Sequence, residues 1–174
     1  MKKDLAVSDK QLLQTILSGK TKEPISRENW INFVKSSYTV ENTLVYMDMT
    51  RFVELYHQTC AKIGLSSNIT DEILVFSVID GMICNDCYAS KESELKVWSE
   101  DICTKLIEAY IKSGSKYEVK VTAKIRDECL RQYRKGKYHP SIFKEIYDVI
   151  GLSILETDFP KFKLNALDHK YFNN

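Results

Sequence analysis

The segment from position 39 to 64 carries apolar residues at helical spacing, and this pattern constrains the fold more than any other feature. The apolar positions step by four, three, one, three and four residues, at Val45, Met49, Phe52, Val53, Tyr56 and Cys60. Such steps place side chains on one face of an α-helix. Thr39 precedes the run as a candidate N-cap, and Gly64 follows it as a stop signal. The sequence therefore predicts a long helix with one buried face.

Similar patterns cover most of the remaining chain. We expect helices from Ser8 to Gly19, from Ser26 onward, from Thr70 onward, from Leu95 to Tyr110, from Thr122 to Tyr133 and from Pro140 to Ile154, with two short helices after a break at residues 157–162. Residues 117–122 alternate like a strand, but no second run could pair with them, so we interpret them as an extended connection. Only 6 Gly and 3 Pro are present, as suits long helices. The prediction is one all-α domain over residues 1–174, folded as a helical bundle.

The charge balance argues against a nucleic-acid partner. The chain has 174 residues and carries 25 Lys plus Arg against 24 Asp plus Glu, a formal charge of +1. Binding to a phosphate backbone needs a clustered positive excess. The basic residues between Lys124 and Lys137 are interrupted by Asp127 and Glu128. We interpret this stretch as a solvated helix face and expect no nucleic-acid partner.

The sequence also indicates where in the cell the protein is expected. Residues 1–10 lack the apolar stretch of a signal peptide. The most apolar segment, Ile73–Ile83, is too short to span a bilayer and contains Ser77 and Asp80. Five Cys without an export signal are expected to be reduced thiols. We therefore expect a soluble cytoplasmic protein with no transmembrane segment.

Catalytic and cofactor motifs are absent from the sequence. The six glycines are isolated, so no glycine-rich loop could cradle a phosphate. The three His are scattered, and none forms a motif with a nucleophile and an acid. His139 precedes Pro140 in a predicted turn, where we expect a surface imidazole. We predict no cofactor and no catalytic group.

One set of residues has the ligand types of a structural zinc site. His57 and Cys60 are separated by two residues, as are Cys84 and Cys87, and four such ligands could bind zinc. Cys60, however, lies on the apolar stripe of the long predicted helix, where a free Cys commonly acts as a small core residue. We predict no metal, and zinc at these four residues or a redox dithiol at Cys84 and Cys87 are the alternatives.

The stretch WINFVKSSYTVENTLVY, residues 30–46, resembles the opening signature of the RGS domain, the regulator of G-protein signalling. The residues that match in order are Trp30, Phe33, Val34, Lys35, Ser36, Tyr38, Glu41 and Asn42, and Tyr46 stands where the family usually has Trp. Residues 11–17, QLLQTIL, are similar to the family's first helix.

The resemblance continues toward the C-terminus. Residues 106–121 are similar to the family's fifth helix and its following turn, and Arg126 fits the start of the sixth. Residues 143–162 resemble the long seventh helix, followed by an acid, an aromatic, Pro, a basic residue and Phe. Together the similar stretches span residues 8–64 and 95–172. The segment of about 65–94 resembles an insertion, and its apolar residues 73–79 form either an extra core helix or a second association surface.

The resemblance implies an all-α fold of about nine helices that binds the switch regions of a heterotrimeric G-protein α subunit, Gα. Such domains act as monomers and accelerate GTP hydrolysis without a catalytic group of their own, because Gα supplies both an arginine and the Gln that orients water. Binding to Gα would also recruit the cytoplasmic chain to the membrane. Two alternatives are an RGS-homology scaffold that binds without activating, and a helical interaction module unrelated to G proteins.

The resemblance also implies the contact residues. Ser37, Tyr38, Glu41 and Asn42 match the family's contact loop, and Lys161 matches the basic residue that supports it. Lys120 falls where the family usually has Asn or Ser, a difference that favours the scaffold alternative. Thr157 falls where an Asp usually holds a partner Thr, and a one-residue shift would place Asp158 there. By local physics alone, Asn42 is merely a short substitute for the Glu or Gln of a capping box that starts at Thr39.

Overall fold

The computed structural model describes the backbone of residues 2–65 and 92–172 and the side chains of residues 9–65 and 92–166. The secondary-structure elements are α1 (Lys2–Leu17), α2 (Arg27–Ser36), α3 (Val40–Lys62), α4 (Glu92–Leu106), the π-helix η1 (Ile107–Ile111), α5 (Ala123–Arg134), the 3-10 helix η2 (Pro140–Phe143), α6 (Lys144–Ser153), the π-helix η3 (Ile154–Asp158) and α7 (Phe159–Phe172). The described residues contain no strand, so the all-α prediction is confirmed.

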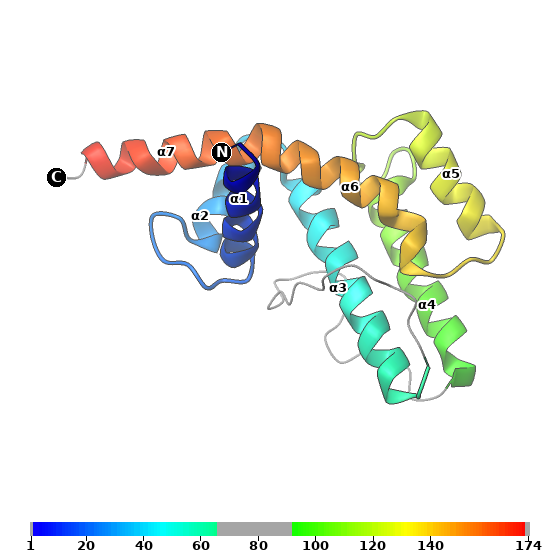
Figure 1. Ribbon diagram of the computed structural model, residues 1–174. Coiled ribbons are helices and arrows are strands. Elements are labelled where there is room, and N and C mark those ends of the chain that lie inside the picture. The colour runs from blue at the N-terminus through cyan, green and yellow to red at the C-terminus, as the bar shows by residue number, and fades with distance from the viewer. Residues whose placement is uncertain (1, 66–91, 173–174) are drawn as a thin grey trace.

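The helices are arranged around α3 (Figure 1). This helix packs against α2, α4 and α6, while α1 packs on α2 and α5 packs on α6. Figure 1 shows that α6 and α7 follow one another as a long rod, with α1 and α2 beside α7 and α5 at the far end of α6. The α2–α3 junction therefore lies near the middle of the rod, where η3 joins α6 to α7.

The rod corrects two sequence-based expectations. The predicted break at residues 157–162 does not occur, because α6, η3 and α7 are continuous from Lys144 to Phe172. Pro160 lacks the N–H of a normal helical hydrogen bond. The π-helical turn immediately before it changes the bonding pattern, and such turns accommodate irregularities without ending a helix. Counted as continuous rods, the described residues form six helical units and not the nine expected. The helix expected from Thr70 lies outside the described residues.

Local sequence signals set several of the observed boundaries. The Ser26 hydroxyl accepts a hydrogen bond from the backbone N–H of Asn29 at 3.2 Å and caps α2. The Thr122 hydroxyl accepts one from Ile125 at 3.4 Å and caps α5. Residues 117–122 form an irregular connection between η1 and α5, as expected. These starting points are the N-caps that hydroxyl side chains favour.

An aromatic cluster joins α2, α3 and α7. Trp30 is fully buried, and its ring lies edge-on to Phe162 with centroids 5.2 Å apart and 6.0 Å from Phe159. Its Nε1–H donates to the Thr43 hydroxyl at 3.2 Å, so the buried indole has the polar partner it needs. This cluster ties the α2–α3 junction to α7.

A second aromatic contact joins α3 to α6. The rings of Tyr46 and Tyr147 stack with centroids 4.6 Å apart. Gly151 lies so close that an added Cβ would be 3.0 Å from Cε2 of Tyr46. A larger residue at position 151 would displace the stacked ring, which explains why glycine is suited to the interior of this helix.

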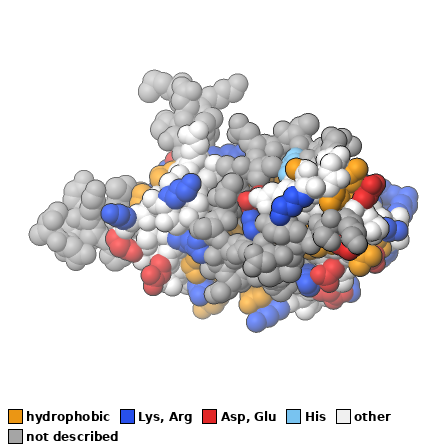
Figure 2. All heavy atoms as spheres, turned by 90° about the horizontal axis from the view of Figure 1, so that it is seen from below, with side chains coloured by type: hydrophobic (Ala, Val, Ile, Leu, Met, Phe, Trp, Pro, Cys, Tyr) orange, Lys and Arg blue, Asp and Glu red, His pale blue; other side chains and the backbone are white. Residues whose placement is uncertain are grey.

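The surface of the described residues mixes both signs of charge. On the face shown in Figure 2, Lys and Arg side chains are interspersed with Asp and Glu side chains. Such mixing is typical of a solvated protein surface. Among the described helices, none is long and apolar enough to cross a membrane.

Candidate partner-binding surface

The α2–α3 junction presents Tyr38 to solvent in an unfavourable backbone conformation. Its φ is 57°, and its side chain is 88% exposed. The left-handed region costs an ordinary residue roughly 1–2 kcal/mol, and glycine or asparagine is usual there. The backbone is fixed by two hydrogen bonds, from Tyr38 N–H to the Lys35 carbonyl at 3.2 Å and from Thr39 N–H to the Val34 carbonyl at 3.0 Å. The aromatic ring gains no burial in return for this cost.

The start of α3 differs from a capping box. Thr39 occupies the N-cap position, as predicted, but its hydroxyl makes no capping hydrogen bond. Instead the Asn42 N–H donates to the backbone carbonyl of Thr39 at 3.2 Å. Glu41 lies in the first turn, where its negative charge interacts favourably with the positive end of the helix dipole. Glu41 and Asn42 are both half-buried, so each side chain retains a solvent-accessible part beside the exposed Ser37 and Tyr38.

Asp158, at the end of η3, lies against this junction. Its side chain is buried, with only 3% of the residue exposed. Burial raises the pKa of Asp158 above its ordinary value, the Thr39 hydroxyl and the Lys161 ammonium lower it, and the Glu41 carboxylate raises it. Although Thr39 interacts with Asp158, its hydroxyl makes no hydrogen bond of normal geometry with any described residue. The fold therefore brings Glu41, Asp158 and Lys161 together from two distant parts of the sequence.

Thr157 and Asp158 face different environments. Thr157 is exposed, whereas Asp158 is among the buried charged residues. A buried carboxylate is poorly placed to meet a partner, and Asp158 instead lies under the α2–α3 junction. Of these two neighbouring residues, Thr157 is the one that is accessible at the surface. Lys161 is exposed as well, one helical turn further along.

Replacing Asp158 by Asn is expected to stabilise the protein at neutral pH. The raised pKa means that the folded protein holds this proton more tightly than the unfolded chain does. The stability that Asp158 contributes is therefore complete below its unfolded pKa and is lost as the pH rises through the folded pKa. An asparagine side chain at this position would stay neutral throughout. Denaturant unfolding over a pH series should show that the advantage of Asp158→Asn grows from acidic to neutral pH.

The matched control is Asp148→Asn on α6, where the carboxylate is exposed and pairs with Lys144. This variant should show no comparable gain at neutral pH, because exposed ion pairs contribute little. An Asp158→Asn protein that is less stable than the wild type at neutral pH would contradict the assigned role of burial.

Lys120 lies on a separate segment, the connection between η1 and α5. Its side chain is exposed, while its neighbour Val119 is fully buried. The Val119 N–H donates to the Tyr110 carbonyl at 2.9 Å. The connection is therefore anchored at Val119 and offers the Lys120 ammonium to solvent.

Two of the four residues of the alternative zinc site, His57 and Cys60, are among the described residues. Cys60 is 2% exposed, and burial raises the pKa of its thiol, while the Tyr56 hydroxyl lowers it. A raised pKa disfavours the thiolate that zinc requires. Cys84 and Cys87 lie outside the described residues. In residues 9–65 and 92–166, no three His, Cys, Asp or Glu side chains form a cluster that could hold a metal ion. Cys60 thus lies where its place on the apolar stripe predicts.

His139 is not the surface imidazole that we expected. It is half-buried, and its ring packs edge-on against Tyr56 with centroids 4.8 Å apart. Its Nδ1 accepts a hydrogen bond from the Ser141 N–H at 3.1 Å and so caps η2. Burial lowers the pKa of His139, and the charges of Lys137 and His57 lower it further. The position directly before Pro140 was a sign of this capping role.

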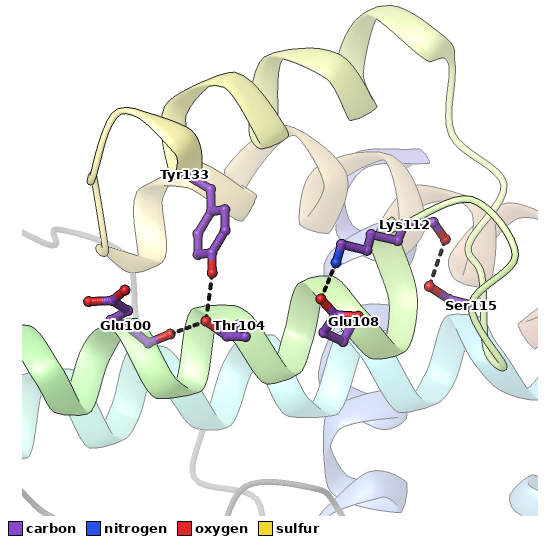
Figure 3. Close-up of polar contacts among 6 residues, drawn as sticks. All are labelled: Glu100, Thr104, Glu108, Lys112, Ser115 and Tyr133. Atoms are coloured by element: carbon purple, nitrogen blue, oxygen red, sulfur yellow. Dashed lines mark hydrogen bonds and ion pairs between the residues drawn. The ribbon is translucent and has the colours of Figure 1, made fainter.

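Two polar contacts between helices were not predicted from the sequence. The Tyr110 hydroxyl donates to Oδ2 of Asp48 at 2.5 Å, and both residues are buried. Figure 3 shows Tyr133 of α5 directed at Thr104 of α4, with 2.7 Å between their hydroxyl oxygens. An acidic residue between Met47 and Met49 was the only sign of the first contact. The second contact left no sign in the periodicity.

Comparison with known proteins does not supply a family. A scan against protein-family models and a search of curated proteins each find no match to this chain.

Proposed function

We propose that this chain is an RGS-type domain that binds the switch regions of a Gα subunit and accelerates its GTP hydrolysis. The surface that would bind Gα, here called the junction surface, consists of Ser37, Tyr38, Glu41, Asn42, Thr157 and Lys161. Asp158 supports this surface from inside. Lys120 would contribute a separate contact from the η1–α5 connection.

Tyr38 is the single observation that carries the proposal. An aromatic side chain that is both exposed and held at positive φ lowers the stability of the isolated domain. Backbone strain of this kind concentrates at functional sites, and aromatic residues are enriched among the residues that dominate binding energy. A partner that covers the ring would supply the burial that the isolated domain lacks.

The surroundings of Tyr38 agree with a prearranged contact surface. Trp30 of α2 packs against Phe159 and Phe162 of α7, and the buried Asp158 carboxylate interacts with Thr39 and attracts Lys161. The α2–α3 junction and α7 are therefore held in one arrangement. The π-helix η1 ends at Ile111, before the connection that carries Lys120. The π-helix η3 ends at Asp158, one helical turn before Lys161. Turns of the π type are frequent at functional sites.

The proposed mechanism is stabilisation of one conformation of the partner. The chain would hold the Gα switch segments as they are in the hydrolysis transition state, while Gα provides the catalytic arginine and Gln. Only binding that is stronger in the transition state than in the GTP state accelerates the reaction. Each tenfold acceleration requires about 1.4 kcal/mol of this differential binding.

Lys120 supports a second candidate function, a scaffold that binds Gα or another partner without activation. The residue is an exposed cation at the position where the resemblance implies Asn or Ser next to the catalytic Gln. A long charged side chain there would not reproduce a short polar contact. Binding through the junction surface could continue without the acceleration.

Single-turnover GTP hydrolysis by purified Gα subunits separates the two functions. We expect the wild-type chain to accelerate hydrolysis by at least about tenfold, which corresponds to about 1.4 kcal/mol. A wild type that binds without acceleration, together with a Lys120→Asn variant that does accelerate, would establish the scaffold function and identify Lys120 as its cause. Absence of both binding and acceleration with every Gα class would contradict the proposal.

Asn42→Ala is expected to weaken Gα binding roughly tenfold, as the loss of about one or two hydrogen bonds to a partner would. The melting temperature should stay nearly constant, because alanine is a better helix former than asparagine and Asn42 is only half-buried. Calorimetric titration and thermal unfolding of the same samples provide the two measurements. A variant that loses stability and retains binding would show that Asn42 serves the helix start alone.

A further inference from the structure

Backbone hydrogen bonds to η1 hold the connection that carries Lys120 on its buried side. Val119 is fully buried, and its N–H bonds to the Tyr110 carbonyl at 2.9 Å, while the Tyr117 N–H bonds to the Ala109 carbonyl at 3.2 Å. The Tyr110 hydroxyl in turn bonds to Asp48 of α3 at 2.5 Å. Residue 119 is thus connected to the same helix that carries Glu41 and Asn42.

The side chain of Arg126 on α5 also holds the connection. Its Nη2 donates to the Val119 carbonyl at 3.1 Å and lies 2.8 Å from Oε1 of Glu118. The other carboxylate oxygen of Glu118 accepts the Gly114 N–H at 2.7 Å. Arg126 and Glu118 are mostly shielded, with side-chain exposures of 21% and 30%. One guanidinium therefore holds the backbone on the N-terminal side of Lys120.

The turn before this connection is fixed by further contacts. Figure 3 shows the Ser115 hydroxyl directed at the Lys112 carbonyl, at 2.6 Å, and Lys112 paired with Glu108 of η1. Gly114 has a φ of 81°, a conformation that suits glycine. The turn itself is thus held locally, and Arg126 adds a side-chain contact from α5 to the residues next to Lys120.

We propose that Arg126 is a positioning residue that orients Lys120 toward the partner, a role that rests on the proposed Gα binding. Arg126 does not need to touch Gα to act in this way. The guanidinium suits the task because its planar donors can serve a carbonyl and a carboxylate together, whereas the ammonium of lysine is a compact point charge. The geometry of the donors, in addition to the charge, holds the connection.

The first test needs no partner. Hydrogen–deuterium exchange of the full chain should show the Val119 and Gly114 amides exchanging at least tenfold faster in Arg126→Gln, with α3 and α7 unchanged. Arg126→Lys should give an intermediate increase. The control is Arg134→Gln, on the exposed last turn of the same helix, which should leave both amides unchanged. Unaltered exchange in Arg126→Gln would overturn the proposal, whatever the partner does.

The second test compares binding to Gα loaded with GDP and aluminium fluoride. Arg126→Gln should weaken binding severalfold when Lys120 is present and should have little effect in a Lys120→Ala background. Equal loss in both backgrounds, or no loss despite faster exchange, would overturn the positioning role. If the wild-type chain itself does not bind, the proposed function fails and the partner role of Arg126 fails with it, while the exchange data still decide whether Arg126 holds the connection.

Discussion

Trp30→Ala is expected to lower the free energy of unfolding by about 3–5 kcal/mol, the range for truncating a large buried aromatic residue. The indole is fully buried between Phe159 and Phe162, and its N–H bonds to Thr43. The substitution removes contacts from α2, α3 and α7 together and leaves the Thr43 hydroxyl without its indole donor. Such a loss is a large part of the roughly 5–15 kcal/mol that stabilises a typical domain. Urea unfolding followed by far-ultraviolet circular dichroism measures it.

Val97→Ala provides the control for this experiment, because Val97 is 70% exposed on α4 and surface substitutions usually change stability by less than about 0.5 kcal/mol. A Trp30→Ala protein that lost less than about 1 kcal/mol would contradict the packing of α2 against α7. It would also remove the basis for placing Lys161 beside the α2–α3 junction.

Tyr38→Gly is expected to change stability and binding in opposite directions. Glycine relieves the strain of the positive φ, and even after its greater freedom in the unfolded chain is counted, the gain in stability is up to about 1 kcal/mol. Gα binding should fall by at least about 30-fold, because an aromatic residue that dominates an interface contributes about 2 kcal/mol or more. Unfolding and binding measured on the same preparations test both signs.

Two further substitutions separate the ring from the backbone. Tyr38→Phe keeps the ring and should retain most of the binding. Tyr38→Asn tolerates positive φ but lacks the ring, so it should bind as weakly as Tyr38→Gly. A glycine variant that is less stable than the wild type would show that the Tyr38 ring stabilises the domain. A glycine variant that binds Gα equally well would show that the ring does not contact the partner.

The sequence predicts those features of the fold that depend on local signals. The stripe from Val45 to Cys60 was sufficient to predict α3, and hydroxyl caps at Ser26 and Thr122 marked two further helix starts. Each signal lies within one or two helical turns of the boundary it sets. Helix existence was therefore easier to predict than the contacts between helices.

The features that were not predicted depend on residues far apart in the chain. Pro160 signals a break, but Phe159 and Phe162 pack around Trp30 and hold the continuous helix in place. Asp158 has the composition of a surface residue, and only its position under the α2–α3 junction makes it buried. Tyr110 and Asp48 pair across two helices. No local pattern contains these contacts, so they require the fold.

The candidate site is a prediction from the resemblance, and the structure shows how exposed each of its members is. Lys161 lowers the pKa of the buried Asp158, and Glu41 raises it. Thr157 is accessible and Asp158 is not, which separates two neighbouring residues that the sequence left as alternatives. The exposure and strain of Tyr38 could not be read from its residue type.

The most direct test of the account is to measure binding of the chain to Gα subunits in three states: with GDP, with a GTP analogue, and with GDP plus aluminium fluoride. The fluoride state mimics the hydrolysis transition state, and a domain that accelerates hydrolysis must bind that state best. We predict the tightest binding to the fluoride state and weaker binding to the other two. Equal affinity for all three states, or no binding to any of them, would contradict the proposed activation of GTP hydrolysis.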